Sequence, residues 1–321
     1  MKLSVILPCY NGAATIATQL DALTTQTWSN GWEVVVVNNG STDPSMEIVE
    51  TYRDRLPLLQ IVNAHTPNQR RLGVSHSYNV GIQAAIGDAF VFCEADDQVG
   101  EGWLTAMGTA LSQHEFVAGS LEYTRLNPEW LIAANPNWQQ RDRPIYNDHP
   151  PHLPFVSGCN IGIQRSVYEA VGKLDESLFC VWDTEYCWRV QQAGYPFTFL
   201  PTIVMHYRLR HTLSGMYQQG YRWGKEYPLL VFRYQEQPAG WATFVQELTS
   251  LVPYVLPGIK LSLMSLLNIR RGRGGFAIWL NGLGFRMGTI RALGQFLLDK
   301  QFFGQASPRG QQALEEKPSG Q

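Results

Sequence analysis

The stretch Ala89-Phe90-Val91-Phe92-Cys93-Glu94-Ala95-Asp96-Asp97 joins a buried-strand pattern to an acidic end. Clustered like charges raise one another's pKa unless a cation or strong hydrogen-bond donors hold them. The carboxyl ends of strands are also where open parallel sheets bind their ligands. The stretch therefore predicts a divalent-metal site that serves a phosphorylated substrate. The alternative is a solvated acidic loop, Asp96-Asp97-Gln98, that leads into a helix after Gly100.

Strand and helix patterns alternate before this stretch. Apolar runs predict strands, and apolar residues at helical spacing predict helices between them. This alternation is typical of βαβ units and a parallel sheet, so residues 1–97 are predicted to form a nucleotide-binding half. The predicted strands cover 3–7, 32–37, 58–62 and 89–93, and the predicted helices cover 13–25, 44–53 and 74–85.

The usual phosphate-binding glycine motifs are missing from the sequence. Neither G-x-G-x-x-G nor G-x-x-x-x-G-K follows the first strand. Phosphate charge must be neutralised in another way, and the acidic cluster with a metal ion is the available means.

The pattern after residue 97 is less regular. A helix is predicted over 102–113 and a loop region rich in Pro, Asn, Trp and Arg over 127–154. The predicted elements that follow are strands over 155–163, 197–200 and 203–205 and helices over 165–171 and 183–193.

Composition narrows the class of protein. The chain has 321 residues, 45% of them hydrophobic, and a formal net charge of −2, so no nucleic-acid partner is predicted. Its five cysteines are scattered without zinc-type spacing, which is typical of reduced thiols in the cytosol. The first strand starts at once after Met1-Lys2, and no signal peptide is predicted.

The C-terminal part is apolar, aromatic and helical in pattern over 241–298. Residues 240–310 hold eight basic side chains against two acidic ones. Amphipathic basic helices are typical of a membrane interface; the alternative is a helical appendage packed on the domain or forming an oligomer. The most apolar part, 251–267, is interrupted by prolines and falls short of a spanning helix. Three regions are thus predicted: 1–225 (1–97 and 98–225), a helical region 226–300, and a disordered tail 301–321.

Several motifs, in this order and spacing, resemble the family 2 glycosyltransferases over roughly residues 3–223. The resemblance implies a GT-A fold (α/β, with a mostly parallel Rossmann-like sheet), a nucleotide-sugar donor, a divalent metal (Mn²⁺ or Mg²⁺) and inversion at the anomeric carbon. The residues that carry it are Ser4–Asn11, Val36–Asp43, Asn79-x-Gly81, Gly87-Asp88, Glu94–Asp97, Gly158–Asn160, Gly172–Phe179, Trp182–Glu185, Arg189 and Ala193–Tyr195.

The resemblance also implies which residues bind the donor. Tyr10 would stack on the nucleobase, and Asn38, in place of the family's Asp, would accept a hydrogen bond from it without charge assistance. Asp43 is either a donor contact or a helix cap. Asp96 is the expected metal ligand and His206 a second one. The full set implied for the nucleotide sugar is Pro8, Tyr10, Asn38, Asp43, Glu94 and Ala95.

Asp183 occupies the place of the family's catalytic base, which takes a proton from the acceptor hydroxyl. The alternative is a helix cap. The form Trp182-Asp183-x-Glu185-Tyr186 also resembles the galactofuranosyltransferases, where the tryptophan and the acids contact sugars. Trp182 and Glu185 are therefore expected at the acceptor.

Gln219-Gly-Tyr-Arg222-Trp223 resembles the QxxRW signature of processive polysaccharide synthases. The resemblance implies that Gln219, Arg222 and Trp223 bind the acceptor, with the arginine near the diphosphate and the tryptophan against a sugar.

Together these features predict an inverting, metal-dependent glycosyltransferase with a lipid-linked or polysaccharide acceptor, in the cytoplasm at the inner face of the membrane. The alternatives are an inactive GT-A module that binds sugar nucleotides or acts as a scaffold, and a sugar nucleotidyltransferase. The second is disfavoured because a glycine-rich loop with Arg and Lys is missing after Pro8.

Overall fold

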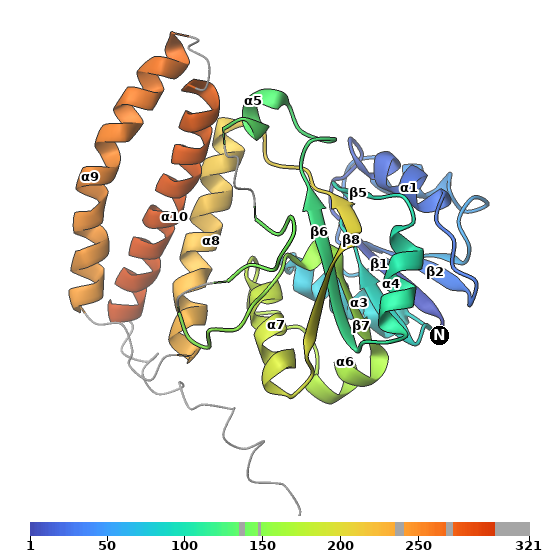
Figure 1. Cartoon of the computed structure of the whole chain (residues 1–321). Helices are drawn as coiled ribbons and strands as arrows, with labels where there is room; N and C mark the ends of the chain where they lie inside the picture. Colours follow the sequence, from blue (N-terminus) through green and yellow to red (C-terminus); the bar gives the residue numbers. More distant parts are fainter. Residues whose placement is uncertain (135–138, 147–148, 235–240, 268–271, 299–321) are drawn as a thin grey trace, which may run out of the picture.

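The computed structural model describes residues 1–134, 139–146, 149–234, 241–267 and 272–298. Among them lies one eight-stranded sheet with the strand order β3-β2-β1-β4-β7-β6-β8-β5 (Figure 1). Its strands are β1 (Leu3–Cys9), β2 (Trp32–Asn38), β3 (Leu59–Asn63), β4 (Ala89–Phe92), β5 (Gln98–Val99), β6 (Phe116–Glu122), β7 (Ile161–Gln164) and β8 (Phe197–His206).

The N-terminal half is the predicted parallel βαβ arrangement. β1 pairs in parallel with β2 and β4, and β2 pairs in parallel with β3. Because side chains alternate across a strand, Val34 and Val36 enter one apolar core and Val35 and Val37 enter the other. The first core is covered by α1 (Ile16–Thr24), α2 (Ser45–Glu50) and α4 (Trp103–Leu111), and the second by α3 (Val74–Ala84), α6 (Arg165–Val171) and α7 (Trp182–Gln192).

The second half differs from the prediction in its strands. β5 and β6 were not predicted, and residues 155–163 hold a bridge at Phe155, the 3₁₀ turn η1 (Gly158–Asn160) and the start of β7 instead of one strand. β8 is continuous where two strands were predicted. β4–β7, β6–β7 and β5–β8 are antiparallel, whereas β6–β8 is parallel. The sheet is therefore mixed, with its parallel part at the N-terminal side.

β6 has a weak strand pattern because it contains Gly119 and Ser120. Its register against β8 shifts between these two residues. A Cβ atom at Gly119 would lie 2.0 Å from the Ile203 carbonyl oxygen, so only glycine fits beside β8. The small residues that allow this approach also remove the branched side chains that identify a strand in sequence. The predicted loop 127–154 contains a short helix, α5 (Glu129–Ile132), and part of it lies outside the described residues.

Three long helices follow the sheet: α8 (Leu213–Tyr234), α9 (Trp241–Leu266) and α10 (Gly272–Leu298). They lie side by side, with α8 next to the sheet domain and α9 outermost (Figure 1). The predicted boundary at residue 225 falls inside α8, because this helix continues as one element from the domain edge into the helical part. The predicted tail 301–321 lies outside the described residues.

Glycines bring α8 and α10 into close contact. A Cβ atom at Gly224 would lie 1.9 Å from the Phe285 carbonyl oxygen, and one at Gly288 would lie 2.2 Å from the Tyr221 carbonyl oxygen. Asn281 and Thr289 of α10 donate hydrogen bonds to carbonyl groups of α8. The backbones of the two helices thus lie in close contact and are linked by hydrogen bonds from side chains of α10 to carbonyl groups of α8.

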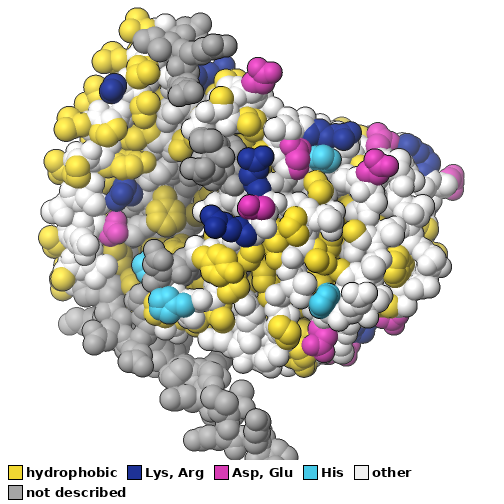
Figure 2. All heavy atoms as spheres, in the orientation of Figure 1, with side chains coloured by type: hydrophobic (Ala, Val, Ile, Leu, Met, Phe, Trp, Pro, Cys, Tyr) yellow, Lys and Arg dark blue, Asp and Glu magenta, His cyan; other side chains and the backbone are white. Residues whose placement is uncertain are grey.

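Among the described residues, α9 is one helix whose length and composition would allow it to cross a membrane. Of its most apolar 18-residue segment, 6% is buried. This corrects the expectation that the apolar segment is too short, because the helix continues through Pro253 and Pro257. Its outer face carries Val252, Leu256 and Ile259, which are 72%, 69% and 54% exposed. Figure 2 shows hydrophobic side chains gathered on the side of the molecule where Figure 1 places α9.

Candidate active site

A cavity of about 420 Å³ lies where β1 and β4 end. Parallel strands place ligands at this edge of a sheet. Five residues predicted to bind the nucleotide sugar or the metal line it together, and these are Pro8, Tyr10, Glu94, Ala95 and Asp96. The structure thus brings the strand end after β1 and the acidic run after β4 into one site.

The acidic run forms a compact oxygen cluster. One carboxylate oxygen from each of Glu94, Asp96 and Asp97 lies within 4.8 Å of the others. Burial, together with the charge of Asp96, raises the pKa of Glu94 to about 8. Burial and the charges of Asp96 and Glu94 also raise the pKa of Asp97 well above its usual range. Without a cation, the surroundings therefore do not stabilise three ionised carboxylates side by side.

The residues present fit a divalent cation. Asp97 is 1% exposed, and its Oδ1 accepts a hydrogen bond from the Arg208 backbone N–H at 2.8 Å, while its buried Oδ2 has no oxygen or nitrogen donor among the described residues. Hard oxygen donors of this kind suit Mg²⁺ and Mn²⁺. Such an ion would also lower the raised pKa values of Glu94 and Asp97.

Two arginines that the sequence reasoning missed contact this cluster. Arg210 Nη1 lies 2.8 Å from Asp96 Oδ2, and Arg208 Nε donates to the Asp96 carbonyl oxygen at 2.8 Å. Both line the cavity. Their signal in the sequence is the basic run Arg208-Leu209-Arg210 directly after β8. Their cationic groups are suited to a diphosphate as well as to a carboxylate.

His206 lies at the end of β8, in register with Glu122 of β6. Its Nδ1 lies 2.7 Å from Glu122 Oε2. It does not belong to the oxygen cluster found among the described residues. A metal-binding role for His206 stays a prediction.

Tyr10 is 44% exposed at the cavity, as a ring that stacks on a base must be. The guanidinium carbon of Arg71 lies 3.4 Å from the centre of this ring. Arg71 also lines the cavity, so it is a second cation that the sequence reasoning missed. Because the loop 64–73 has no strand or helix pattern, its approach to Tyr10 was not readable from spacing.

The structure places Asn39, and not Asn38, at the cavity, and base binding by Asn38 stays a prediction. Asn38 does not line the cavity; its Nδ2 donates to Asn63 Oδ1 at 3.0 Å and its Oδ1 accepts from the Ser41 N–H at 2.9 Å. Asn39 lines the cavity and is 4% exposed. Its Nδ2 donates to the Leu72 carbonyl oxygen, while its buried Oδ1 has no hydrogen-bond partner in the part of the chain that the structure describes. Asn38 ends β2 and turns toward β3, which leaves the next residue to face the site.

Asp43 is held by hydrogen bonds to the segments where α1 and α2 begin. Its Oδ2 accepts from the Ala13 N–H at 3.0 Å, and its Oδ1 accepts from the N–H and hydroxyl of Ser45. These bonds hold the start of α1 and the start of α2, and Asp43 does not line the cavity.

Asp183 lies in the first turn of α7. Its Oδ2 accepts from the Gly158 N–H at 3.0 Å and its Oδ1 from the Thr184 N–H at 2.8 Å. Burial raises its pKa to about 6, although these hydrogen bonds lower it. The charge of Asp183 contributes a smaller part of the raised pKa of Glu94, and Asp183 itself does not line the cavity. A carboxyl group with this pKa suits a general base near neutral pH.

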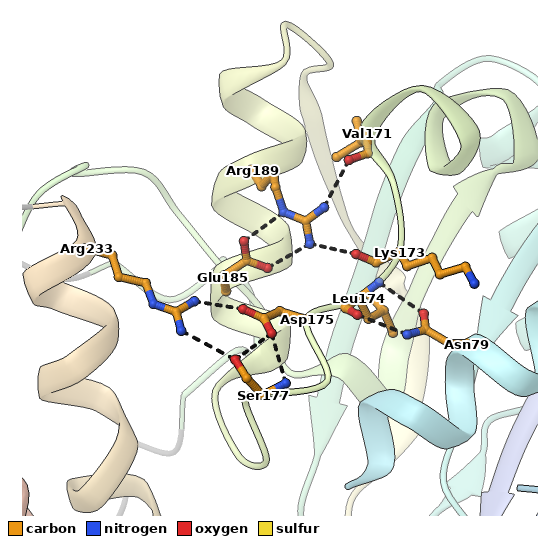
Figure 3. Close-up of polar contacts among 9 residues, drawn as sticks. All are labelled: Asn79, Val171, Lys173, Leu174, Asp175, Ser177, Glu185, Arg189 and Arg233. Atoms are coloured by element: carbon orange, nitrogen blue, oxygen red, sulfur yellow. Dashed lines mark hydrogen bonds and ion pairs between the residues drawn. The ribbon is translucent and has the colours of Figure 1, made fainter. Parts of the chain in front are cut away.

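Trp182 and Glu185 are engaged inside the protein, contrary to the expectation that they face an acceptor. Trp182 is 3% exposed and packs against Tyr78 and Phe92 in the core. Glu185 is 7% exposed and forms two hydrogen bonds, of 2.7 and 2.9 Å, with the Arg189 guanidinium (Figure 3). Both side chains stabilise the region around Asp183 from within.

The QxxRW residues lie on α8. Arg222 is exposed, and Trp223 is 39% exposed. One turn further on, Glu226 accepts hydrogen bonds from the backbone N–H groups of Phe179 and Cys180. Phe179 lines the cavity, whereas Gln219, Arg222 and Trp223 do not, and acceptor binding by these three residues stays a prediction.

Comparison with known proteins identifies the family. The sequence profile described as Glycosyl transferase family 2 matches residues 4–172, more than half of the chain. The chain belongs to this family. It is 32% identical to the uncharacterized glycosyltransferase YibD of Escherichia coli over 43% of the chain and 37% of the relative. It is 28% identical to glycosyltransferase AglE of Haloferax volcanii over 63% of the chain and 65% of the relative. The chain thus spans less than two thirds of these relatives.

Solved structures share the fold at low sequence identity. The mannosyltransferase PcManGT from Pyrobaculum calidifontis, in complex with GDP-Man and Mn²⁺, has a TM-score of 0.59 and 17% identity over 91% of this chain and 86% of its own. S. aureus TarS 1–349 in complex with UDP-GlcNAc has a TM-score of 0.53 and 17% identity over 92% and 93%. The predicted GT-A fold is therefore confirmed.

Proposed function

We propose that the protein is an inverting, metal-dependent glycosyltransferase that uses a nucleotide-sugar donor. The support for the proposal is a cavity whose wall holds the acidic run Glu94-Ala95-Asp96, together with a separate buried carboxyl group at Asp183. Glu94, Asp96 and Asp97 form an oxygen cluster that fits a divalent cation. Asp183 lies apart from the cluster, with a pKa of about 6.

These groups have separate roles in the proposed transfer. Asp96, with Asp97 beside it, would hold Mn²⁺ or Mg²⁺, and a bound ion supplies Lewis-acid stabilisation of the departing nucleoside diphosphate. Tyr10 offers its ring to the base, and the amide of Asn39, which lines the same cavity, is the candidate polar contact to the base. Arg208 and Arg210 offer positive charge to the diphosphate. Asp183 takes the proton of the acceptor hydroxyl as that oxygen attacks the anomeric carbon from the face opposite the leaving group.

The class of donor has support from the relatives in the structural comparison. PcManGT is in complex with GDP-Man and Mn²⁺, and TarS with UDP-GlcNAc. A neutral asparagine in the base pocket can accept from a ring N–H as well as donate to a carbonyl oxygen. The donor panel in an assay must therefore include both uridine and guanosine diphosphate sugars.

The acceptor is proposed to be lipid-linked or a growing polysaccharide at the cytoplasmic face of a membrane, reached by peripheral contact. The support is the apolar outer face of α9 together with charge, because the described residues of α8, α9 and α10 hold seven basic and two acidic side chains. A basic unit with an apolar face binds anionic lipid surfaces.

Vesicle co-sedimentation tests this contact. The double variant Val252→Asp/Leu256→Asp should lose binding to phosphatidylglycerol vesicles. The matched control Ile86→Asp changes an equally apolar side chain, 57% exposed, outside α9 and should bind like wild type. Failure of the wild type to bind the vesicles would contradict the contact.

Transfer and donor hydrolysis with Mn²⁺ test the activity. Wild type should turn over at least one nucleotide sugar, whereas Asp183→Asn and Asp96→Ala should not. Binding of nucleotide sugars without any turnover would favour the alternative of an inactive sugar-nucleotide-binding module. Normal turnover by Asp183→Asn would refute the mechanism.

A further inference from the structure

The loop 172–181 joins α6 to the helix that carries Asp183. It brings Phe179 to the cavity wall and ends two residues before the proposed base. Any inference about this loop rests on the proposed function of Asp183. The loop is held from two sides, and the two sides belong to different parts of the molecule.

The sheet domain holds the first half of the loop. Arg189 of α7 donates to the carbonyl oxygens of Val171 and Lys173, each at 3.0 Å (Figure 3). Asn79 of α3 exchanges two hydrogen bonds of 3.0 Å with the backbone of Leu174 (Figure 3). These contacts fix the loop where it leaves α6.

The helix α8 contacts both halves of the loop, and in the second half it is joined by Ser75 of α3, which donates to the Leu178 carbonyl oxygen at 3.1 Å. Glu226 Oε2 accepts from the backbone N–H of Phe179 at 2.9 Å and from that of Cys180 at 2.6 Å. Arg233, two turns further along α8, lies 2.8 Å from Asp175 Oδ2 (Figure 3). A carboxylate that accepts two consecutive backbone N–H groups fixes the direction of the chain there, because charge-assisted hydrogen bonds are short and strong.

The helix that makes these contacts is itself fixed to α10. The close glycine contacts and the hydrogen bonds from Asn281 and Thr289 described above leave α8 little freedom to turn. The position of the carboxylate of Glu226 is thus set by the C-terminal helices. The sheet domain makes no comparable described contact with the N–H groups of Phe179 and Cys180.

We propose that Glu226 is a positioning residue for catalysis, through which the C-terminal helices hold Phe179 and the start of α7 in the geometry that the transfer needs. Glu226 touches no reacting atom. It acts on the loop, and the loop sets where Asp183 and the cavity wall lie relative to the donor. The C-terminal helices are therefore part of the catalytic unit.

The test compares Glu226→Ala and Glu226→Gln with the control Lys225→Ala, an exposed neighbour on the same helix with no described hydrogen bond or ion pair to the loop. Glu226→Ala should lower kcat about ten- to hundredfold, because a displacement of about 1 Å in a catalytic geometry costs about a hundredfold. Its Kd for the nucleoside diphosphate should stay within about twofold of wild type. Glu226→Gln keeps one acceptor oxygen and should recover part of the lost kcat, and Lys225→Ala should match wild type.

Hydrogen exchange supplies a readout that does not depend on turnover. The amides of Phe179 and Cys180 should exchange at least about tenfold faster in Glu226→Ala, while those of Val34–Val37 in β2 stay protected. Wild-type kcat in Glu226→Ala, or unchanged exchange at these two amides, would overturn the proposal. Equal loss of protection in β2 would show a general loss of stability and would also overturn it. An inert wild type would instead refute the proposed function.

Discussion

The sharpest prediction concerns the pH dependence of transfer. Burial raises the pKa of Asp183 from its ordinary 3.8 to about 6. A general base works only when it is deprotonated, and kcat/KM reports the pKa of the free enzyme. With donor and Mn²⁺ saturating, kcat/KM for the acceptor should rise about tenfold per pH unit up to about pH 6 and then level off. The kcat/KM of Asp183→Asn should be lower by a factor of about 10²–10⁴ and should not show this rise with pH.

The same pKa makes a prediction for stability that separates loss of catalysis from unfolding. Because the folded state raises this pKa, the protonated form is favoured in the fold. Stability from this group is full below about pH 4 and is lost as pH rises through 6. The loss amounts to at most about 3 kcal/mol. The asparagine in Asp183→Asn carries no charge but replaces one of two acceptor oxygens by a donor, which costs about 1 kcal/mol. At pH 7.5 the variant should therefore gain up to about 2 kcal/mol in free energy of unfolding.

Urea unfolding at pH 5 and pH 7.5 measures this difference, alongside the pH–rate profile. An acid limb centred near pH 4 would show that Asp183 is not the buried base described here. A limb that persists unchanged in Asp183→Asn would show that another group, such as Glu94, titrates in its place. A variant that loses both activity and stability at pH 7.5 would refute the reasoning from burial.

Three further outcomes follow from single contacts. Arg210→Ala removes the cation beside Asp96. In calorimetry without nucleotide, the affinity for Mn²⁺ should rise about two- to fivefold, since exposed ion pairs contribute up to about 1 kcal/mol. An unchanged Kd for Mn²⁺ would show that Arg210 does not compete with the ion. Tyr10→Ala should weaken nucleoside diphosphate binding by about 1–3 kcal/mol if the ring stacks on the base, and equal affinity in both proteins would contradict stacking. Gly288→Ala should destabilise the fold by about 1–3 kcal/mol, because the added Cβ meets the Tyr221 carbonyl oxygen. Its matched control on α10, Gly294→Ala, has room for the Cβ and should be neutral or stabilising by up to about 1 kcal/mol in thermal unfolding.

The parallel half of the fold was readable from sequence because its signals are local. Val34–Val37 are apolar at every position, as a strand buried on both faces must be, and the helices between strands have clear spacing. The acidic run after β4 was readable for the same reason. The strand β6 was not, because its close approach to β8 needs Gly119 and Ser120, which weaken a strand pattern.

The parts of the site that sequence reasoning missed depend on contacts between distant segments. Arg71 and Arg210 reach the cavity from loops that have no helical or strand periodicity. Glu226 reaches Cys180 of the loop 172–181 from a helix 46 residues further along the chain. The choice between Asn38 and Asn39 depended on where β2 ends, which a motif cannot fix to one residue. The motif predicts a sugar contact for Trp182, but the start of α7 turns its ring into the core.

The central claim is that Asp96 and Asp183 have separate roles, one in holding the donor through a metal and one in accepting a proton. Calorimetric titration of the nucleoside diphosphate with and without Mn²⁺, in wild type, Asp96→Ala and Asp183→Asn, tests it most directly. The account predicts that Asp183→Asn binds like wild type in the presence of Mn²⁺ although it does not catalyse transfer, and that Asp96→Ala loses the part of the affinity that depends on Mn²⁺. Equal binding by all three proteins, or loss of Mn²⁺-dependent binding in Asp183→Asn, would contradict it.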